Sequence, residues 1–429
     1  MATGGLAPAA TGNGTFVALG RESRLPADFA AGIAAAGGEV VYSVPEIGLA
    51  VVRSSKADFA SRAARIKGLE SVTPDIVIPM VPVSSETPQI SDVGGPSAAP
   101  ELVDPPFTDD DDGFFDLQWS MDALDWTDAV GISSVRGQGV RVAILDSGIL
   151  STHNEFQSNL NTALSTSFVP GETFDSPAGF HGTHVSGIVA AADNGLGTIG
   201  VAPEVELVMV KVLSAITGSG SFAGAAAGLV YAGNIGADVA NMSFGAHFGL
   251  DGKLLSNCVV VGQTTPQAVQ AIITLMSRAA NYAERRGVTL IGSAGNCAFN
   301  SDEDPNIVHV PSILPQVLAI SASAPVGWGL DPDTNLDLLA SYSSLGSEIA
   351  FGAPGGDSAL RSGALCTILT GPNNVPVTVP CWVFDLVLSA SNASPTTYSW
   401  AGGTSMSSPA AVGVAALIIS KNGGSMSPA

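Results

Sequence analysis

The chain has 429 residues, a hydrophobic fraction of 46% and a formal net charge of −22 at pH 7. This length exceeds that of one typical domain and predicts two or three, with enough apolar material for buried cores. The acidic excess argues against nucleic acid or an anionic membrane as a partner, because both would be repelled. Apolar runs of about ten residues are too short to cross a bilayer.

Residues 15–80 predict a small unit of their own. TFVALG, EVVYSV, GLAVVRS and SVTPDIVIPM are strand-like, whereas PADFAAGIAAAG and KADFASRAARIKG are helix-like. The resulting order, β-α-β-β-α-β, is that of the ferredoxin-like split motif. We assign residues 1–83 to this α+β unit, whose role depends on the rest of the chain.

Residues 84–115 are rich in Pro, Ser, Gly and acidic side chains, which predicts a linker. Residues 84–125 contain eleven acidic and no basic side chains. The run Asp109–Asp112 lacks the glycine and the spacing of a known calcium loop. Solvated charge is therefore the favoured interpretation of this run, and a calcium-binding role is the alternative.

From residue 116 to residue 429, short apolar runs alternate with helix-like stretches. The runs RVAILD, VELVMVKVL, DVANMSF, VTLIGSA, QVLAISAS and EIAFGAP are typical of parallel strands that are buried on both faces. The helix-like stretches are HVSGIVAAA, FAGAAAGLVYAG and PQAVQAIITLMSRAANYAERRG. We expect a doubly wound, mostly parallel α/β sheet, with its reactive groups at the carboxyl ends of strands.

Four polar residues lie at such strand ends or at helix starts. Asp146 closes RVAILD, His181 opens HGTH before an apolar helix, and Asn296 ends GVTLIGSAGN. Ser405 precedes an apolar helix predicted for residues 410–419, with Pro409 near its start, where proline is tolerated. Taken singly, each residue has an ordinary explanation as a turn former or a helix cap.

Taken together, the motifs LDSG, HGTHVSG, NMSFG, SAGN and GTSMSSP closely resemble those of the subtilisin-like serine proteases. The resemblance runs from about Gln118 to the C-terminus. Residues 15–80 resemble the inhibitory propeptide that precedes the catalytic domain in this family. The resemblance implies a secreted, monomeric serine endopeptidase, made as a zymogen, that cleaves polypeptides and is inhibited by its own propeptide.

The resemblance also implies roles for individual residues. Asp146 would orient His181, which would take the proton of Ser405, while the Asn296 side chain and the Ser405 amide would bind the oxyanion. Two segments would form the edges of the substrate cleft, and a third would help to wall the pocket: Ser219, Gly220 and Ser221; Ser243, Phe244 and Gly245; and Ser293, Ala294 and Gly295. Because none of these residues is charged, we expect a broad, apolar-leaning preference.

A calcium site is implied in the same way by the loop AADNGLGTIGVAP. Its ligands would be the side chains of Gln118, Glu155 and Asn194 and the carbonyls of Ala192, Leu196 and Thr198. Glu155 stands where the family usually has aspartate and is longer by one carbon. Residues 195–200 also satisfy G-x-G-x-x-G, but they follow a helix and precede a strand. This order is the reverse of a dinucleotide-binding turn, which argues against a nicotinamide or flavin cofactor.

The four cysteines form no C-x-x-C pair, which argues against a zinc site. Two disulfides would fit an extracellular protein, and four cysteines allow three pairings. We favour Cys366 with Cys381, which closes a short loop, and therefore Cys258 with Cys297. Four reduced, buried cysteines are the alternative.

Two other functions remain open at this point. The family usually continues beyond the serine helix, whereas this chain stops soon after Ile419. This end predicts a truncated catalytic domain and leaves a catalytically silent, subtilisin-like binding protein as the alternative. A metal hydrolase using His181 and His184 is more distant, since the H-E-x-x-H glutamate is missing.

Overall fold

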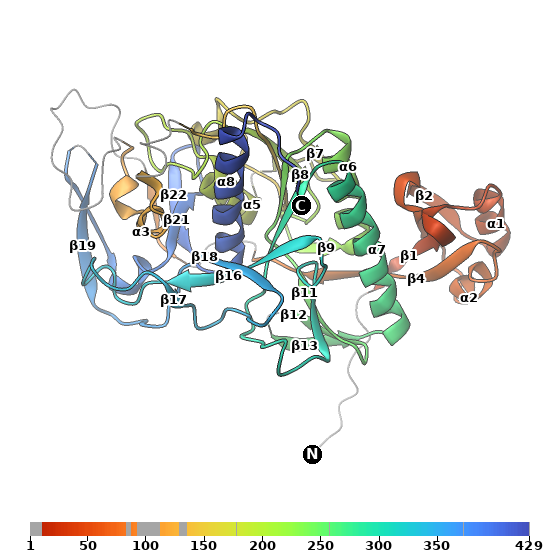
Figure 1. Ribbon diagram of the computed structural model, residues 1–429. Coiled ribbons are helices and arrows are strands. Elements are labelled where there is room, and N and C mark those ends of the chain that lie inside the picture. The colour runs from red at the N-terminus through yellow and green to blue at the C-terminus, as the bar shows by residue number, and fades with distance from the viewer. Residues whose placement is uncertain are drawn as a thin grey trace, which may run out of the picture.

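The computed structural model describes residues 11–82, 87–91, 112–127, 135–176, 178–256, 258–371 and 373–428. A small N-terminal unit stands at one end of a much larger unit (Figure 1). Within the described ranges, no helix combines the length and the hydropathy that crossing a bilayer requires.

The N-terminal unit has the predicted order of elements. These are β1 (Thr11–Gly20), α1 (Phe29–Ala36), β2 (Glu39–Val44), β3 (Leu49–Arg53), α2 (Phe59–Ala63) and β4 (Leu69–Pro79). The strands pair antiparallel in the order β2-β3-β1-β4. A small core holds α1 and α2 against the sheet and includes Phe29, Ile33 and Phe59. Helix α1 ends at Gly37, whose φ of 93° is left-handed and costs glycine little.

The sheet of the N-terminal unit packs on two helices of the larger unit. Val17, Leu19 and Val51 belong to the same hydrophobic cluster as side chains of α6 (Phe222–Asn234) and α7 (Pro266–Arg285). The two units therefore share a buried apolar interface. In addition, β4 pairs antiparallel with β9 (Ser219–Ser221), so that one five-stranded sheet spans both units.

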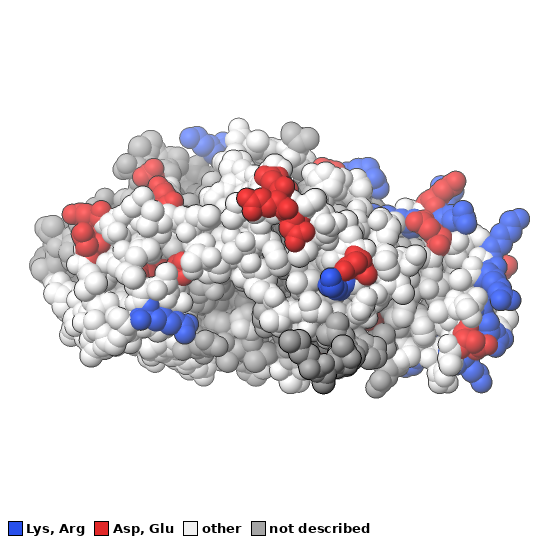
Figure 2. Space-filling model, turned by 90° about the horizontal axis from the view of Figure 1, so that it is seen from below, with Lys and Arg blue, Asp and Glu red and all other residues white. Residues whose placement is uncertain are grey.

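An arginine reinforces the edge of this interface. The Arg278 guanidinium on α7 donates to the carbonyl oxygens of Gly20 at 2.8 Å and Ile47 at 3.3 Å, and it forms an ion pair with Glu70. Residues 1–83 contain seven of the sixteen Lys and Arg residues, and Figure 2 shows basic side chains gathered at the N-terminal unit's end of the molecule. The net negative charge therefore resides in the rest of the chain.

The larger unit is built on a mostly parallel sheet. Its strands are β6 (Arg141–Asp146), β7 (Thr166–Ser167), β8 (Glu206–Lys211), β10 (Val239–Met242), β14 (Thr289–Ser293), β16 (Val317–Ala324), β17 (Leu338–Leu339) and β18 (Ile349–Pro354). The order is β17-β16-β14-β10-β6-β8-β7, with β18 also pairing with β16. Only the β16–β17 pair among these is antiparallel.

Helices cover both faces of this sheet. Successive side chains along β6 point to opposite faces and pack against different helices. Ala143 and Leu145 lie in the cluster that contains α6 and α7. Val142 and Ile144 lie in the opposite cluster, with α5 (Phe180–Ala190) and α8 (Thr404–Lys421). Figure 1 shows α6 and α7 on one side of the sheet and α5 and α8 on the other. The predicted doubly wound α/β fold is therefore confirmed.

Smaller elements surround this framework. A four-stranded antiparallel sheet in the order β13-β12-β11-β15 consists of β11 (Ala246–Gly249), β12 (Lys253–Ser256), β13 (Val259–Gln263) and β15 (Ile307–Val310). Strands β19 (Leu365–Thr370) and β20 (Val375–Pro380) form a hairpin. Strands β5 (Gln89–Ser91), β21 (Val387–Ala390) and β22 (Thr397–Ala401) form a three-stranded sheet. A short helix, α3, spans Trp119–Asp122.

Within the predicted linker, residues 84–115, the structure describes 87–91 and 112–115, and both parts contact the larger unit. Strand β5 pairs with β22, and Asp112, Phe114 and Phe115 are buried. Of the run Asp109–Asp112, only Asp112 lies within the described residues, and it is 1% exposed rather than solvated. The two phenylalanines explain the ordering, because they bury apolar surface that the polar composition around them conceals.

The serine helix begins earlier than predicted. Helix α8 begins at Thr404 rather than near Ala410, so Pro409 lies inside it. Proline lacks the amide that would bond to the carbonyl four residues earlier, which is that of Ser405. The Ser243 hydroxyl donates to this carbonyl oxygen instead, at 2.8 Å. The helix tolerates Pro409 because a side chain from another segment replaces the missing donor.

Substituting Leu229 by alanine tests the layer formed by α6. Leu229 is 0% exposed, and Leu229→Ala should lower the free energy of unfolding by about 2–5 kcal/mol through lost burial and a residual cavity. Ile216→Ala is the control, because Ile216 is 71% exposed and should change that energy by less than about 0.5 kcal/mol. Chemical denaturation of both variants measures the difference, and equal effects would contradict the packing of α6.

Candidate active site

A buried carboxylate and an imidazole meet where β6 ends and α5 begins. His181 Nδ1 lies 2.9 Å from Asp146 Oδ1 and 3.0 Å from Oδ2. The Asp146 side chain is 0% exposed and the His181 side chain 1%. The backbone N–H of Ser147 also donates to Asp146 Oδ1, at 2.6 Å. An imidazole that donates Nδ1–H to a carboxylate keeps Nε2 as a proton acceptor. His181 Nε2 is buried and has no hydrogen-bond partner among the described residues.

Ser405 lies in the first turn of α8, beside the segment that follows β10. Its hydroxyl donates to the Ser243 carbonyl oxygen at 3.0 Å, and the Ser243 hydroxyl donates to the Ser405 carbonyl oxygen at 2.8 Å. Ser408 and Asn241 extend this contact, since the Ser408 hydroxyl donates to the Asn241 side chain at 2.7 Å. The hydroxyl proton of Ser405 is therefore directed at Ser243 and not at His181.

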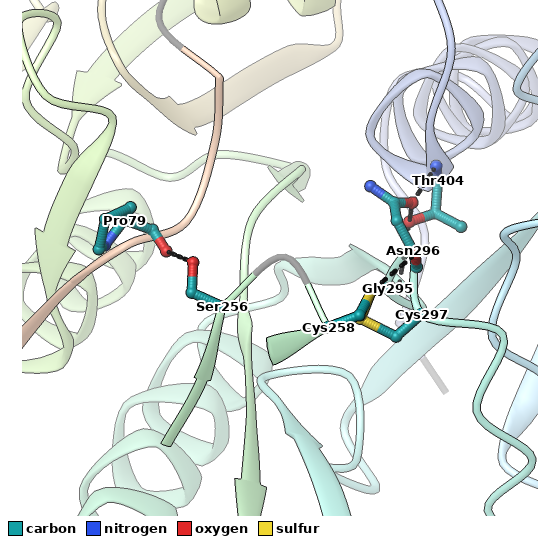
Figure 3. Close-up of a disulfide and its surroundings, with 7 residues drawn as sticks. All are labelled: Pro79, Ser256, Cys258, Gly295, Asn296, Cys297 and Thr404. Atoms are coloured by element: carbon teal, nitrogen blue, oxygen red, sulfur yellow. Dashed lines mark hydrogen bonds between the residues drawn. A yellow bond between two sulfur atoms is a disulfide. The ribbon is translucent and has the colours of Figure 1, made fainter. Parts of the chain in front are cut away.

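Asn296 follows β14 and is held by the residue before the serine. Its Oδ1 accepts hydrogen bonds from the Thr404 amide at 2.9 Å and the Thr404 hydroxyl at 2.8 Å (Figure 3). Since both donors bind the oxygen, the Nδ2 group remains available to another acceptor. This Nδ2 lies beside Gly403, in the turn that leads to Ser405: it is 3.4 Å from the position that a Cβ atom on Gly403 would take.

His184, the second histidine of HGTH, is bonded to a different segment of the chain. It is 0% exposed, and its Nε2 lies 3.0 Å from the Ser399 carbonyl oxygen. Burial lowers the pKa of His184 to about 3. No cluster of three or more His, Cys, Asp or Glu side chains suited to a metal occurs among the described residues.

Residues 77–82, here called the cleft strand, pass directly in front of these groups. Val77, Ile78 and Pro79 pair with Ser221, Gly220 and Ser219, respectively. Beyond this pairing, the amides of Met80 and Val81 donate to the Gly218 carbonyl oxygen at 2.9 and 3.3 Å. A cavity of about 350 Å³ lies where the cleft strand ends, lined by Val81, Pro82, His181, Asn296 and Ser405, among others. Thus the predicted edge at Ser219–Ser221 binds an extended strand of the chain itself.

A second cavity, of about 220 Å³, opens beside Ser405. Of the residues predicted to wall it, Phe244, Gly245, Ser293 and Gly295 line it, together with Asn296. Ala294 is buried and Ser243 contacts Ser405; neither lines the cavity. The structure therefore gathers most of the predicted wall residues around one pocket.

Two histidines that the sequence analysis missed also line this pocket. The rings of His247 and His309 have centroids 4.5 Å apart, and His309 Nδ1 lies 2.7 Å from the Ser312 hydroxyl. Burial lowers the pKa of His247 to about 4, and burial together with His247 lowers that of His309 well below its usual value. Both rings are therefore neutral at pH 7, and the pocket is more polar than predicted.

Of these two histidines, only His247 left a sequence signal, because it follows the SFG motif closely. A further missed residue, Lys211, left a clearer signal, because it is the one charged residue inside the apolar run LVMVKVL. It ends β8 in register with Asp146 on the neighbouring strand, is 0% exposed and forms an ion pair with Glu172 at 3.0 Å. Its ammonium also donates to the carbonyl oxygens of Ser147 and Leu213, so it supports the turn that follows Asp146.

Both favoured disulfides are present. Cys366 and Cys381 join β19 to the residue after β20, and Cys258 joins Cys297. Cys258 and Cys297 also line the pocket described above, next to Asn296. The described chain contains no free cysteine.

The loop after α5 brings together the predicted calcium ligands only in part. The fully buried Glu155 carboxylate accepts hydrogen bonds from the side-chain Nδ2 of Asn194 at 3.1 Å, the backbone N–H of Thr198 at 3.3 Å and the Tyr398 hydroxyl. The carbonyl donors proposed at Ala192, Leu196 and Thr198 lie in the same loop. Gln118 instead binds the backbone of the next residue, Ile199, through both its amide nitrogen and its amide oxygen, each at 2.9 Å.

Asp112 contacts the same loop, which the sequence analysis did not foresee. Its Oδ1 accepts hydrogen bonds from the amides of Asn194 at 3.3 Å and Leu196 at 2.8 Å. Two buried carboxylates, those of Asp112 and Glu155, thus face one short segment. The Thr198 hydroxyl is buried there without a hydrogen-bond partner among the described residues. Carboxylates, a hydroxyl and backbone carbonyls are ligand types that calcium takes, and its charge would offset the two carboxylates. Asn194, however, presents its side-chain nitrogen to Glu155, and its oxygen accepts from the Leu196 amide.

Comparisons with known proteins show which family the chain resembles. Residues 137–429 match the model of the Subtilase family. Subtilisin Savinase of Lederbergia lenta is 34% identical over 286 residues, which cover 67% of this chain and 78% of that protein. Subtilisin DY of Bacillus licheniformis is 31% identical over 294 residues, covering 68% of this chain and 81% of that protein.

Solved structures resemble the chain over most of its length. The epidermin leader peptide processing serine protease of Staphylococcus aureus has a TM-score of 0.68 and 19% identity, and the match covers 95% of this chain and 88% of that one. Fervidolysin of Fervidobacterium pennivorans has a TM-score of 0.65 and 20% identity over 100% of this chain and 57% of that one. At these identities the likeness concerns the fold alone.

Proposed function

Since this chain belongs to the subtilase family and is a serine endopeptidase, we propose that Asp146, His181 and Ser405 carry its reaction. The observation that supports this most strongly is the pair of short contacts between the buried Asp146 carboxylate and His181 Nδ1. The pair holds an imidazole with its Nε2 unpartnered, next to a cavity that Ser405 also lines. A catalytically silent binding protein would have no need of this arrangement.

In the proposed mechanism, the Ser405 hydroxyl turns from the Ser243 carbonyl toward His181 Nε2. His181 takes the hydroxyl proton while Ser405 Oγ attacks the substrate carbonyl carbon, and His181 then gives that proton to the leaving amine. The Asp146 carboxylate stabilises the imidazolium that forms in between. Water hydrolyses the resulting acyl-enzyme by the same steps.

The negative charge that develops on the substrate oxygen requires donors that are already in place. Thr404 binds Asn296 Oδ1 from two sides, which leaves Nδ2 directed away from it and toward the Ser405 turn. We assign this Nδ2, with the Ser405 amide, to the oxyanion. The polar pocket with His247 and His309 would receive the side chain that precedes the scissile bond.

Replacing these residues one at a time tests the assignment. Ser405→Ala and His181→Ala should each abolish detectable peptide hydrolysis, with similar losses, because triad members act as a unit. Asn296→Ala should lower kcat by about 10² to 10³, the magnitude known from subtilisin, the prototype of this family. Initial rates on a peptide substrate measure both effects.

The control is Ser408→Ala, which removes a neighbouring hydroxyl and should retain activity at a level far above that of Ser405→Ala. Stoichiometric labelling of the wild type by a fluorophosphonate, and none of Ser405→Ala, is the expected companion result. Absence of labelling in both would support the silent binding protein instead.

The N-terminal unit is proposed to be an inhibitory propeptide, so that the enzyme is made as a zymogen. The cleft strand supports this, because it occupies the edge at Ser219–Ser221 where a substrate would pair. The shared apolar interface and the Arg278 contacts hold the unit in place. The two disulfides further support secretion into an oxidising compartment.

Asp75 makes this inhibition sensitive to pH. It lies on β4, is 7% exposed and bonds to the Ser221 side chain of the larger unit. Burial raises its pKa to about 7, whereas an exposed aspartate has a pKa of about 3.9. The bound unit therefore holds an extra proton between these two pH values, and its binding weakens as pH rises toward 7.

Release of the N-terminal unit should accordingly be faster at pH 7 than at pH 5, and Asp75→Asn should remove this difference, because an amide does not titrate. The measurement is the rate at which activity appears after dilution of the processed chain at each pH. Asp58→Asn is the control, since Asp58 is exposed and should leave the pH dependence intact. An unchanged dependence in Asp75→Asn would exclude this carboxyl as its source.

A structural calcium ion at the loop after α5 completes the proposal. Glu155 and Asn194 would hold it with carbonyl groups of the loop, and Asp112 lies close enough to the same segment to contribute charge. The ion would stabilise the fold and takes no part in the proton transfers.

Chelation should therefore lower the melting temperature of the wild type, and added calcium should restore it. At a calcium concentration of 100 times Kd, the stabilisation is about 2.7 kcal/mol. Glu155→Gln should melt at a temperature that no longer depends on calcium. Scanning calorimetry with and without a chelator measures this, and a melting temperature of the wild type that is indifferent to calcium would refute the site.

A further inference from the structure

We propose that the Cys258–Cys297 disulfide positions Asn296 for catalysis, so that the enzyme's turnover depends on the oxidation state of this bond. The proposal rests on the assignment of Asn296 to the oxyanion. It assigns to one of the two disulfides a function beyond stability, and it makes Cys258 and Cys297 positioning residues that act through Asn296.

The contacts around Asn296 come from two sides. On one side Thr404 binds the side-chain oxygen with two donors. On the other side the covalent bond begins at the very next residue, Cys297, and Cys258 Sγ lies 3.3 Å from the Asn296 carbonyl oxygen. Figure 3 shows Asn296 between Thr404 and the disulfide. Thr404, at the start of α8, thus fixes the side-chain amide of Asn296, and the disulfide fixes the backbone next to it.

The backbone at this point needs such support. Asn296 follows Gly295, which has a φ of 99°, and precedes Ala298, which has a φ of 48° that is unfavourable for a residue with a Cβ. The segment from Ala294 to Phe299 has no helix or strand of its own, and Asn296 is exposed. An oxyanion donor is effective only if it is held close to its productive position, since a misplacement of about 1 Å can cost 10²-fold in rate.

The same bond also connects the segment of Asn296 to a residue that contacts the cleft strand. Cys258 stands between β12 and β13, two residues after Ser256, whose hydroxyl donates to the Pro79 carbonyl oxygen of the cleft strand at 3.0 Å. One covalent bond therefore joins a contact with the bound strand to the segment that carries Asn296 (Figure 3). Breaking the bond would uncouple the Ser256 contact from the segment that carries Asn296.

Reduction requires a reagent that can reach the sulfur atoms. Cys258 is exposed, so a small dithiol can attack the bond through a mixed disulfide. Two electrons and two protons pass from the dithiol to the bond, which gives the two thiols of Cys258 and Cys297 and the oxidised dithiol. Reoxidation reverses this balance and should restore the positioning.

The test compares two double variants with the processed wild type in their active-site-titrated forms. Cys258→Ser/Cys297→Ser should lower kcat for a peptide substrate by about 10- to 100-fold, with KM changed by less than about threefold. Cys366→Ser/Cys381→Ser is the matched control, because it removes the other disulfide, in the β19–β20 hairpin, and should retain the wild-type kcat. Retention of kcat by the first variant would overturn the proposal.

A second test does not depend on whether Cys258→Ser/Cys297→Ser folds. Oxidised Cys366→Ser/Cys381→Ser enzyme contains only the disulfide next to Asn296, so treatment with a dithiol should lower its kcat, and removal of the reductant with reoxidation should recover it. Unchanged kcat after complete reduction, verified by mass after thiol alkylation, would also overturn the proposal.

A double-mutant cycle separates positioning from a general loss of structure. In the Asn296→Ala background, removing the Cys258–Cys297 bond should cost less than about twofold in kcat, because the group that it positions is already missing. An equal loss in both backgrounds would mean that the bond acts independently of Asn296. If Asn296→Ala itself left kcat unchanged, the oxyanion assignment would fail instead, which distinguishes the two failures.

Discussion

The need of one buried carboxylate for hydrogen-bond donors governs the arrangement of the site. An ionised Asp146 that is 0% exposed would be very costly without partners, and His181 with the Ser147 amide supplies them. Because Asp146 ends β6 and His181 lies in α5, this contact relates a strand end to a helix start. Helix α8 packs on α5 in one hydrophobic cluster, and Ser405 lines the same cavity as His181.

Main-chain pairing plays the corresponding role for recognition. The edge at Ser219–Ser221 binds the cleft strand through backbone groups, which all residues except proline possess in full. In the proposed function, side chains would then refine the choice of substrate inside the pocket, where His247 and His309 present polar atoms beside apolar walls. Reactivity would depend on a few side chains with strict geometry, whereas binding would begin with backbone contacts that are indifferent to sequence.

The sequence allowed the fold class and both disulfides to be predicted. It also allowed the strand ends that carry Asp146 and Asn296 to be predicted, because each is encoded in one short stretch. Contacts between residues that are far apart in the sequence were harder to predict. The start of α8 was misplaced since Ser243 replaces the donor that Pro409 lacks, and the pocket's polarity was missed since His309 meets His247 only after folding. Asp112 was read as solvated because its partners, the backbone amides of Asn194 and Leu196, are distant in the sequence.

The continuous sheet that joins the two units has a consequence for solubility. A strand edge with unpaired amides and carbonyls is a template for association with other chains. Strand β9 is such an edge, and β4 covers it as long as the N-terminal unit stays in place. In this structure the N-terminal unit therefore keeps the β9 edge from pairing with other chains, and loss of the unit would leave that edge open to association until another strand occupies it.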